Sequence, residues 1–270
     1  MRQLYTLALG AMLVGPATLA AQSRQTERDA FTLSERIPQG AWIRIRNVNG
    51  EIRVRAGTSD KVEVTATRSW RRGDPKDATV ETKRGSDGSI LLCAIWVDND
   101  TECTENHYST HNNRRRSSSE RNNNDVVIDF EVRLPKGVKV GVWTVNGGVS
   151  VDGATAEVNA GTVNGSVDAF STGAPVQANT VNGSVRAGMG RLDNDRDLDF
   201  STVNGSVVVE FTGDIDADVD LSTVNGRFQT DWPVTISGRI DPRRLRATLG
   251  KGGRRIRLST VNGNVELRKR

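Results

Sequence analysis

The chain has little of what a deeply packed enzyme core would need. Aromatic residues make up only 5% of its 270 residues, whereas glycine occurs 27 times. This balance favours thin, regular β-structure over a thick aromatic core. The two histidines, His107 and His111, stand in a strongly polar stretch, which disfavours a positioned Ser/His/Asp triad. Phosphate-binding loops and Gly-x-Ser-x-Gly motifs are also missing, so we expect no catalytic residue and no cofactor.

Long apolar runs are missing beyond the N-terminus, and the charge balance is mild. No later segment approaches the 18 or more apolar residues of a membrane span, so none is expected in the mature chain. The formal net charge is +4, from 37 basic and 33 acidic residues. The basic residues lack interleaved aromatic side chains for base stacking, so nucleic acid is not an expected partner.

Residues 1–21 have the pattern of a signal peptide. Arg2 supplies a positive start, an apolar run follows from Leu4 to Val14, and small residues precede Gln22. The sequence therefore predicts an exported protein that is periplasmic, at the cell surface or secreted.

Cysteine occurs twice, as Cys93 and Cys103. In an oxidising compartment two cysteines on either side of a turn favour a disulfide. A metal site formed with His107 and His111 is the alternative, although the spacing matches no usual zinc pattern.

One short motif occurs seven times, six times as Thr-Val-Asn-Gly and once as Asn-Val-Asn-Gly. The motif glycines from Gly147 onward are 18, 18, 22, 21 and 37 residues apart. A period near 20 is typical of repeats that must stack to bury an apolar face. The last gap is interpreted as two coils, one without the motif at about Val234 to Leu249. The seven pairs predicted to form structural corners are Asn49-Gly50, Asn146-Gly147, Asn164-Gly165, Asn182-Gly183, Asn204-Gly205, Asn225-Gly226 and Asn262-Gly263.

Apolar residues alternate on both sides of each motif, but with opposite parity. Because strand side chains have period two, a switch of parity between Thr and Val predicts that the chain turns there. Asn-Gly is also the strongest hairpin signal, so an antiparallel meander or sandwich stays open as an alternative. We favour an all-β, single-stranded parallel β-helix or β-solenoid, in which the motif Val points inward and the Asn side chains form ladders.

The strings TVNGSV and STVNG, the signal peptide and the ending RRIRLSTVNGNVELRKR resemble the bacterial putative-adhesin family of β-strand-repeat proteins. That family is a domain of unknown function and is similar to head domains of auto-transporter adhesins. The resemblance covers about residues 30–270 as one continuous domain. It implies a right-handed β-helix and an exported location, and it implies no catalytic residues.

The chain is divided at residue 135. Residues 22–135 are predicted to form an irregular N-terminal β-section that covers the open end of the solenoid, and residues 136–270 the repeat solenoid. Within the first part, residues 98–125 are almost entirely polar and are predicted to be a disordered loop. A basic tether for anionic polymers is the alternative function for this loop.

Aspartates recur at equal distances before two motif glycines. Asp197 and Asp199 precede Gly205 by eight and six residues, as Asp218 and Asp220 precede Gly226. In stacked coils these carboxylates are predicted to form two adjacent rows on the outer face. A surface ion-pair network with nearby arginines is one interpretation, and a Ca²⁺ site is the other.

Three functions remain open from the sequence. The first is an adhesin-like structural protein that presents a repetitive face to an envelope or extracellular ligand, either polysaccharide or protein. The second is a β-helix polysaccharide lyase or hydrolase, and the third is an envelope-stress accessory protein that binds another protein.

Overall fold

The computed structural model describes residues 24–96, 100–111, 125–172, 174–190, 196–234 and 241–270. The predicted signal peptide, residues 1–21, lies outside the described residues. Among the described residues, no helix has the length and apolar character needed to cross a membrane.

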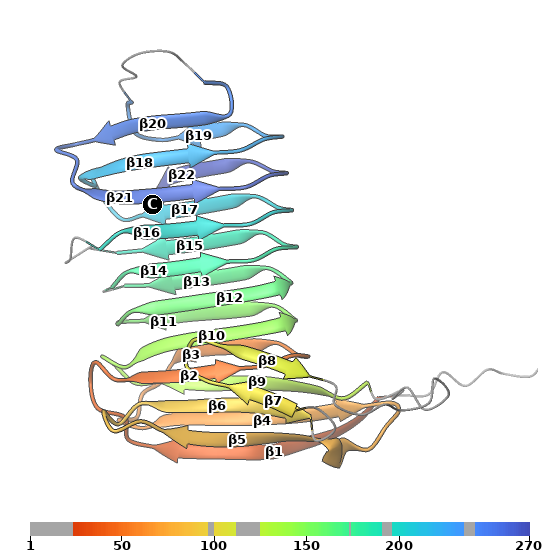
Figure 1. The fold of residues 1–270 in the computed structure, drawn as a ribbon. Coiled ribbons are helices and arrows are strands. Elements are labelled where there is room, and N and C mark those ends of the chain that lie inside the picture. The colour runs from red at the N-terminus through yellow and green to blue at the C-terminus, as the bar shows by residue number, and fades with distance from the viewer. Residues whose placement is uncertain (1–23, 97–99, 112–124, 173, 191–195, 235–240) are drawn as a thin grey trace, which may run out of the picture.

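Two ten-stranded sheets run side by side and form an elongated rod (Figure 1). Sheet 1 holds the strands that follow the motifs and three N-terminal strands, in the order β1 (Gln25–Glu35), β4 (Val62–Trp70), β9 (Val127–Leu134), β3 (Ile52–Ala56), β11 (Val149–Ala154), β13 (Val167–Ser171), β15 (Val185–Met189), β17 (Val207–Phe211), β22 (Val265–Lys269) and β19 (Phe228–Thr230). Sheet 2 holds the strands that lead into the motifs and three further strands at its two ends, in the order β20 (Arg244–Leu249), β18 (Ala217–Ser222), β21 (Arg254–Ser259), β16 (Leu198–Ser201), β14 (Val176–Asn179), β12 (Val158–Asn164), β10 (Lys139–Asn146), β2 (Trp42–Arg46), β6 (Ile90–Trp96) and β5 (Ala78–Arg84).

Neighbouring coils stack in parallel with equivalent residues opposite each other. Val140 lies opposite Val158, and Thr144 lies opposite Thr162. The inward members of each strand, mostly Val, Ala, Leu, Ile and Phe, form one continuous core between the sheets. Each coil cannot bury this face alone, so stacking supplies the apolar contact that holds the rod together. The predicted all-β solenoid is confirmed, and the antiparallel meander is excluded because the strands on either side of each regular motif belong to different sheets.

The direction of the motif side chains differs from the prediction. The motif threonines are buried, whereas four of the seven motif valines are exposed, Val224 at 50% and Val181 at 40%, and the other three are half-buried. The prediction that the motif Val points inward was therefore wrong. The parity switch itself is present, because Val, Asn, Gly and the following residue make up the outside of the corner and the core pattern resumes after them.

The last two coils are stacked out of sequence order. Strand β21 lies between β16 and β18, and β22 lies between β17 and β19 (Figure 1). The C-terminal coil thus fills a gap between two coils made earlier in the chain. The interpretation of Val234 to Leu249 as a coil without its motif was wrong: β20 pairs antiparallel with the outer edge of β18, and residues 235–240 lie outside the described part.

The N-terminal residues form the other end of the same rod. Strands β2 and β3 make the first motif coil, and β6 and β9 stack beneath them in parallel. Antiparallel strands β5, β4 and β1 then complete the two sheets, with the short 3-10 turn η1 (Pro75–Asp77) before β5. Both sheets run across the predicted boundary at 135/136 without a break.

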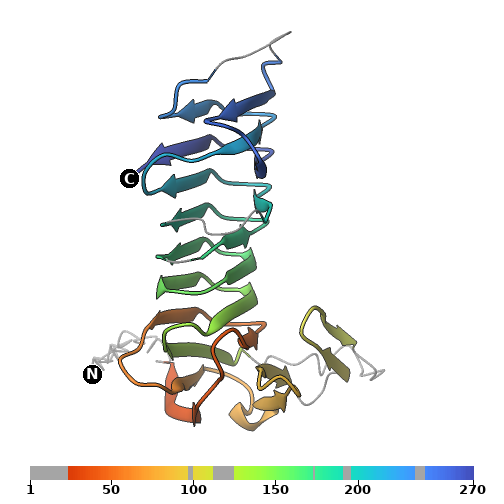
Figure 2. The same cartoon turned by 90° about the vertical axis from the view of Figure 1, so that its left-hand side faces the viewer.

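Part of the segment predicted to be a disordered loop, residues 98–125, is folded. Strands β7 (Asp100–Cys103) and β8 (Tyr108–His111) form a two-stranded antiparallel hairpin. Figure 2 shows this hairpin on the outside of the rod near its N-terminal end. The rest of the predicted loop, residues 98–99 and 112–124, lies outside the described part of the chain.

Candidate functional site

The motif asparagines form one hydrogen-bonded ladder along the rod. In six of the seven, the side-chain Nδ2 donates to the Oδ1 of the asparagine on the neighbouring coil, at 2.8–2.9 Å. The spatial order is Asn49, Asn146, Asn164, Asn182, Asn204, Asn262 and Asn225. Since each inner amide both donates and accepts within the ladder, these side chains mainly hold the coils in register.

The motif threonines satisfy a second set of groups inside the corner. The Oγ1 of Thr162 donates to the carbonyl oxygen of Gly147 at 2.8 Å, and Thr180 and Thr202 repeat this bond one coil further along. A buried carbonyl without a partner costs about 1–3 kcal/mol. The inward threonine therefore gives the glycine carbonyl of the neighbouring coil a hydrogen-bond donor, which an inward valine could not provide.

The motif glycines stand where a side chain cannot fit. Gly165 has φ +156°, and a Cβ placed there would lie 2.1 Å from the carbonyl oxygen of Gly147. Gly183 repeats this close approach to Gly165. The seven Asn-Gly corners are thus explained by stacking geometry. On the outside, the corners leave a stripe of four exposed valines: Val181, Val203, Val261 and Val224.

The four aspartates proposed as a calcium site are separated by arginines. Asp199 lies opposite Arg257 of β21, and on the other side of β21 Arg257 lies opposite Asp220. Arg255 likewise lies opposite Asp218. The predicted adjacency of the two acidic rows was wrong, because the C-terminal coil inserts between β16 and β18. Among the residues that the structure describes, no group of three or more His, Cys, Asp or Glu could hold a metal ion.

The ion-pair interpretation fits this surface. Arg244 Nε donates to Oδ1 of Asp220 at 2.8 Å, its Nη2 pairs with Oδ2, and Arg246 Nε lies 3.7 Å from Oδ2. The hydrogen bonds from Arg244 hold the pKa of Asp220 below its usual range, and burial opposes this only in part. Asp220 therefore favours its ionised form.

Asp218 is also engaged by its own chain. Its Oδ1 accepts a hydrogen bond from the Thr248 hydroxyl at 2.7 Å, and its Oδ2 accepts from the Gly253 amide at 3.3 Å. A hydrogen bond of 2.8 Å from the Lys251 amide to Asp216 Oδ1 holds the turn between β20 and β21 close to the start of β18. The two strands that this turn connects thus lie on either side of β18 and hold it in place.

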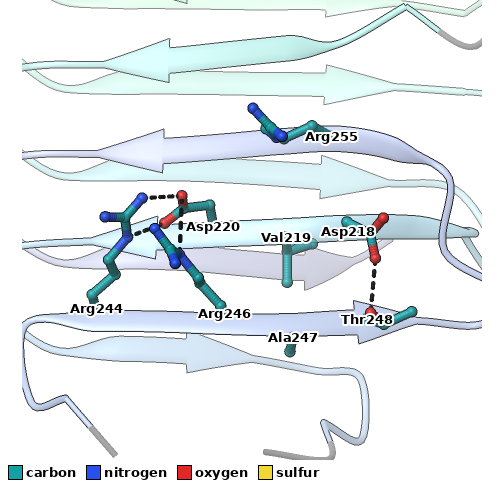
Figure 3. Close-up of a pocket in the computed structure, with 8 residues that line it drawn as sticks. All are labelled: Asp218, Val219, Asp220, Arg244, Arg246, Ala247, Thr248 and Arg255. Carbon is teal, nitrogen blue, oxygen red and sulfur yellow. Dashed lines mark hydrogen bonds and ion pairs between the residues drawn. The ribbon is translucent and has the colours of Figure 1, made fainter.

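Residues of β18, β20 and β21 line an open groove of about 730 Å³ near the β20 edge of sheet 2 (Figure 3). Its lining residues are Asp218, Val219, Asp220, Arg244, Arg246, Ala247, Thr248 and Arg255. The Arg246 side chain is 68% exposed, and Arg255 lies on the opposite side of β18 from β20. We call this feature the arginine groove.

Cys93 and Cys103 form a disulfide that ties the hairpin to sheet 2. The cysteines are therefore not metal ligands, and the alternative with His107 and His111 is excluded. Tyr108 supports the same contact: its hydroxyl donates to the Ala94 carbonyl at 2.6 Å, and its ring lies 6.1 Å from that of Trp143. Burial raises the pKa of Tyr108 to about 12.

Sequence reasoning anticipated part of the arginine groove. It named Asp218 and Asp220 and the arginines of the C-terminal coil, although in a different order of strands. It missed Thr248 and the turn at Gly250–Gly253. The Gly-rich string LGKGG does indicate a turn, but no local signal shows that this turn places its two strands on either side of β18.

Comparison with known proteins gives a fold-level likeness only. Neither a protein-family model nor a curated protein matches the sequence. A putative cell adhesion protein from Clostridium sporogenes is 7% identical over 92% of this chain and 100% of its own, with a TM-score of 0.48. A putative adhesin from Bacteroides fragilis is 13% identical over 92% of this chain and 99% of its own, with a TM-score of 0.37. At TM-scores below 0.5, neither likeness is close enough to transfer a function.

Proposed function

We propose that this chain is an exported, non-enzymatic, adhesin-like protein that binds an envelope or extracellular ligand along the outer face of sheet 2. One observation carries the proposal: the corners and the inward side chains hold the rod together, and the outward side chains stand in register. One such column passes from Arg44 through Gly141 and Asn159 to Gln177. A second passes from Asp199 through Arg257 and Asp220 to Arg246.

Such columns suit an extended ligand. Strands in a sheet are about 4.8 Å apart, so the face repeats polar contacts at that interval along the rod. The core and the corners do not depend on the outward residues. These residues can therefore differ to suit a ligand without loss of the fold. A folded rod of this kind also presents its contacts without an ordering cost at binding.

A carbohydrate-active enzyme is the weaker candidate. Glycoside hydrolysis needs a carboxylic acid with a raised pKa beside a second carboxylate. In the arginine groove, Arg244 lowers the pKa of Asp220, and Asp218 already accepts two hydrogen bonds. The charge arrangement thus favours binding over proton transfer.

The test is retention of the fluorescently labelled mature chain on intact bacterial envelopes and on protease-treated envelopes. We expect saturable retention on intact envelopes that is competed by unlabelled chain, and its survival after protease treatment would identify a polysaccharide ligand. Retention that disappears after protease treatment would favour the accessory protein that binds another protein. Retention no greater than that of an unrelated protein of similar charge would contradict the proposal.

A further inference from the structure

We infer that the arginine groove binds the anionic groups of an acidic polysaccharide, an inference that rests on the proposed function and names its ligand. The groove is defined by strands β18, β20 and β21, and it is separate from the Asn ladder at the corners. The ligand chemistry is a carboxylate or sulfate carried on a sugar chain.

The first argument is a surplus of hydrogen-bond donors. Asp220 is occupied by Arg244, and Asp218 by Thr248 and Gly253. Each guanidinium has five N–H donors. Within the part of the chain that the structure describes, Arg246 has a single ion-pair contact, the distant one with Asp220 at 3.7 Å, and the exposed Arg255 has no ion pair with the groove residues. A ligand that fits must therefore bring acceptors, and anionic oxygens are the strongest of these.

The second argument is the position of these donors. Arg246 and Arg257 lie opposite Asp220 from β20 and β21, on its two sides. Two strand spacings separate their backbones by about 10 Å. Arg255 lies two residues before Arg257 on the same strand and extends the donor set along the groove. A chain that lies along the rod axis can thus place successive anionic groups near Arg255 and near Arg246, both of which line the groove.

The third argument separates a sugar chain from other polyanions. None of the described residues that line the groove carries an aromatic ring, so bases would find no stacking surface there. Double-stranded nucleic acid carries one charge per ~1.7 Å of axis, which Asp218 and Asp220 would oppose. A carboxylate has about four acceptor sites, so the lone pairs that contacts within the chain leave on Asp218 and Asp220, and those of the Thr248 hydroxyl, can instead accept hydrogen bonds from sugar hydroxyl groups between widely spaced charges.

Binding to defined oligosaccharides tests the inference, with affinity measured by calorimetry. The probes are an oligogalacturonate, its methyl ester, a sulfated oligosaccharide and polyglutamate. We expect the two anionic sugars to bind, with the ratio of their affinities identifying the preferred anion. The methyl ester should bind at least about tenfold more weakly, since charge-assisted hydrogen bonds are lost. Equal binding of the methyl ester, or tighter binding of polyglutamate, would overturn the inference.

The variant Arg246→Gln/Arg255→Gln should weaken binding of the preferred anionic sugar by about tenfold or more. It leaves the Arg244–Asp220 pair in place, so its melting temperature should match that of the parent. The matched control is Arg71→Gln/Arg72→Gln, which removes the same charge from exposed residues next to β4, at the other end of the rod. Equal weakening by both variants would show a general charge effect and overturn the inference.

Adhesion of Arg246→Gln/Arg255→Gln and of the parent to envelopes separates this inference from the proposed function. If Arg246→Gln/Arg255→Gln still adheres to envelopes as well as the parent, the ligand binds elsewhere on the rod and only the inference fails. If the parent itself does not adhere to envelopes, the proposed function fails even when the oligosaccharide binds.

Discussion

The threonine, asparagine and glycine of the motif each have a separate role at the corner. Threonine donates to a carbonyl of the neighbouring coil on the inside, asparagine joins a ladder on the outside, and glycine lets the backbones approach. Each motif thus serves the contact between coils more than the conformation of its own coil. This explains why the motif recurs so uniformly while the outward residues of the strands vary.

Gly165→Ala tests the close approach of neighbouring coils. The new Cβ would lie 2.1 Å from the Gly147 carbonyl oxygen, so the stacked backbones must separate. We expect the free energy of unfolding to fall by about 3 kcal/mol or more, from overpacking together with backbone strain. Equilibrium urea denaturation measures this.

The matched control is Gly213→Ala. Gly213 also has a positive φ, +86°, but a Cβ there meets nothing within 4 Å. It should cost only about 1–2 kcal/mol, which is the conformational penalty alone. An equal loss of unfolding free energy in Gly165→Ala and Gly213→Ala would contradict this account, because it would show that the close contact between coils is not the reason for the motif glycine.

At the scale of the strand, the sequence is sufficient to predict the core. The alternation of Val158, Ala160 and Thr162 identifies the inward face, and the change of parity identifies the corner. The direction of the motif Val could not be predicted in this way. It depends on which residue can reach the carbonyl oxygen of the neighbouring glycine, and only the stacked structure shows that threonine does so.

The hairpin β7–β8 was missed because its stability does not come from an apolar pattern. It is held to sheet 2 by the Cys93–Cys103 disulfide and by Tyr108. Composition alone classifies such a segment as disordered, since it has few apolar residues to bury. The disulfide itself was predicted, but not that it would hold a folded hairpin against sheet 2.

Titration of Tyr108 tests how this hairpin is attached. Burial raises the pKa of Tyr108 to about 12, so docking favours the neutral phenol. The stability that the phenol contributes should be fully present below about pH 10, the pKa of an exposed tyrosine, and should be lost as the pH rises through about 12. Phenolate absorbance in a Tyr5→Phe background, which leaves one tyrosine, measures the midpoint.

The double variant Cys93→Ala/Cys103→Ala provides the comparison. Without the disulfide the hairpin can leave sheet 2, and the Tyr108 midpoint should fall toward about 10. Circular dichroism at each pH separates this local release from unfolding of the rod. A midpoint near 10 in the protein with its disulfide would show that the hairpin is not docked.

The order of the coils is the property of the whole molecule on which the site depends. Because β21 lies between β16 and β18, Arg255 and Arg257 separate two aspartate pairs that sequence order would have placed side by side. Sequence periodicity cannot predict this inversion. All the motif coils carry nearly the same corner, so the motif by itself does not specify which coil stacks on which.

Cysteine pairs placed on the exposed valine stripe test this order most directly. Adjacent strands lie about 4.8 Å apart, within the Cα separation that a disulfide spans, whereas two strand spacings, about 10 Å, lie outside it. The observed order is Asn204, Asn262 and Asn225, so Val203, Val261 and Val224 should follow it. The background is Cys93→Ala/Cys103→Ala, and mass spectrometry after mild oxidation gives the yield of each disulfide. The structure predicts efficient cross-linking of Val203→Cys with Val261→Cys, and little of Val203→Cys with Val224→Cys. Efficient cross-linking of positions 203 and 224 would contradict the inserted C-terminal coil, and with it the arginine groove.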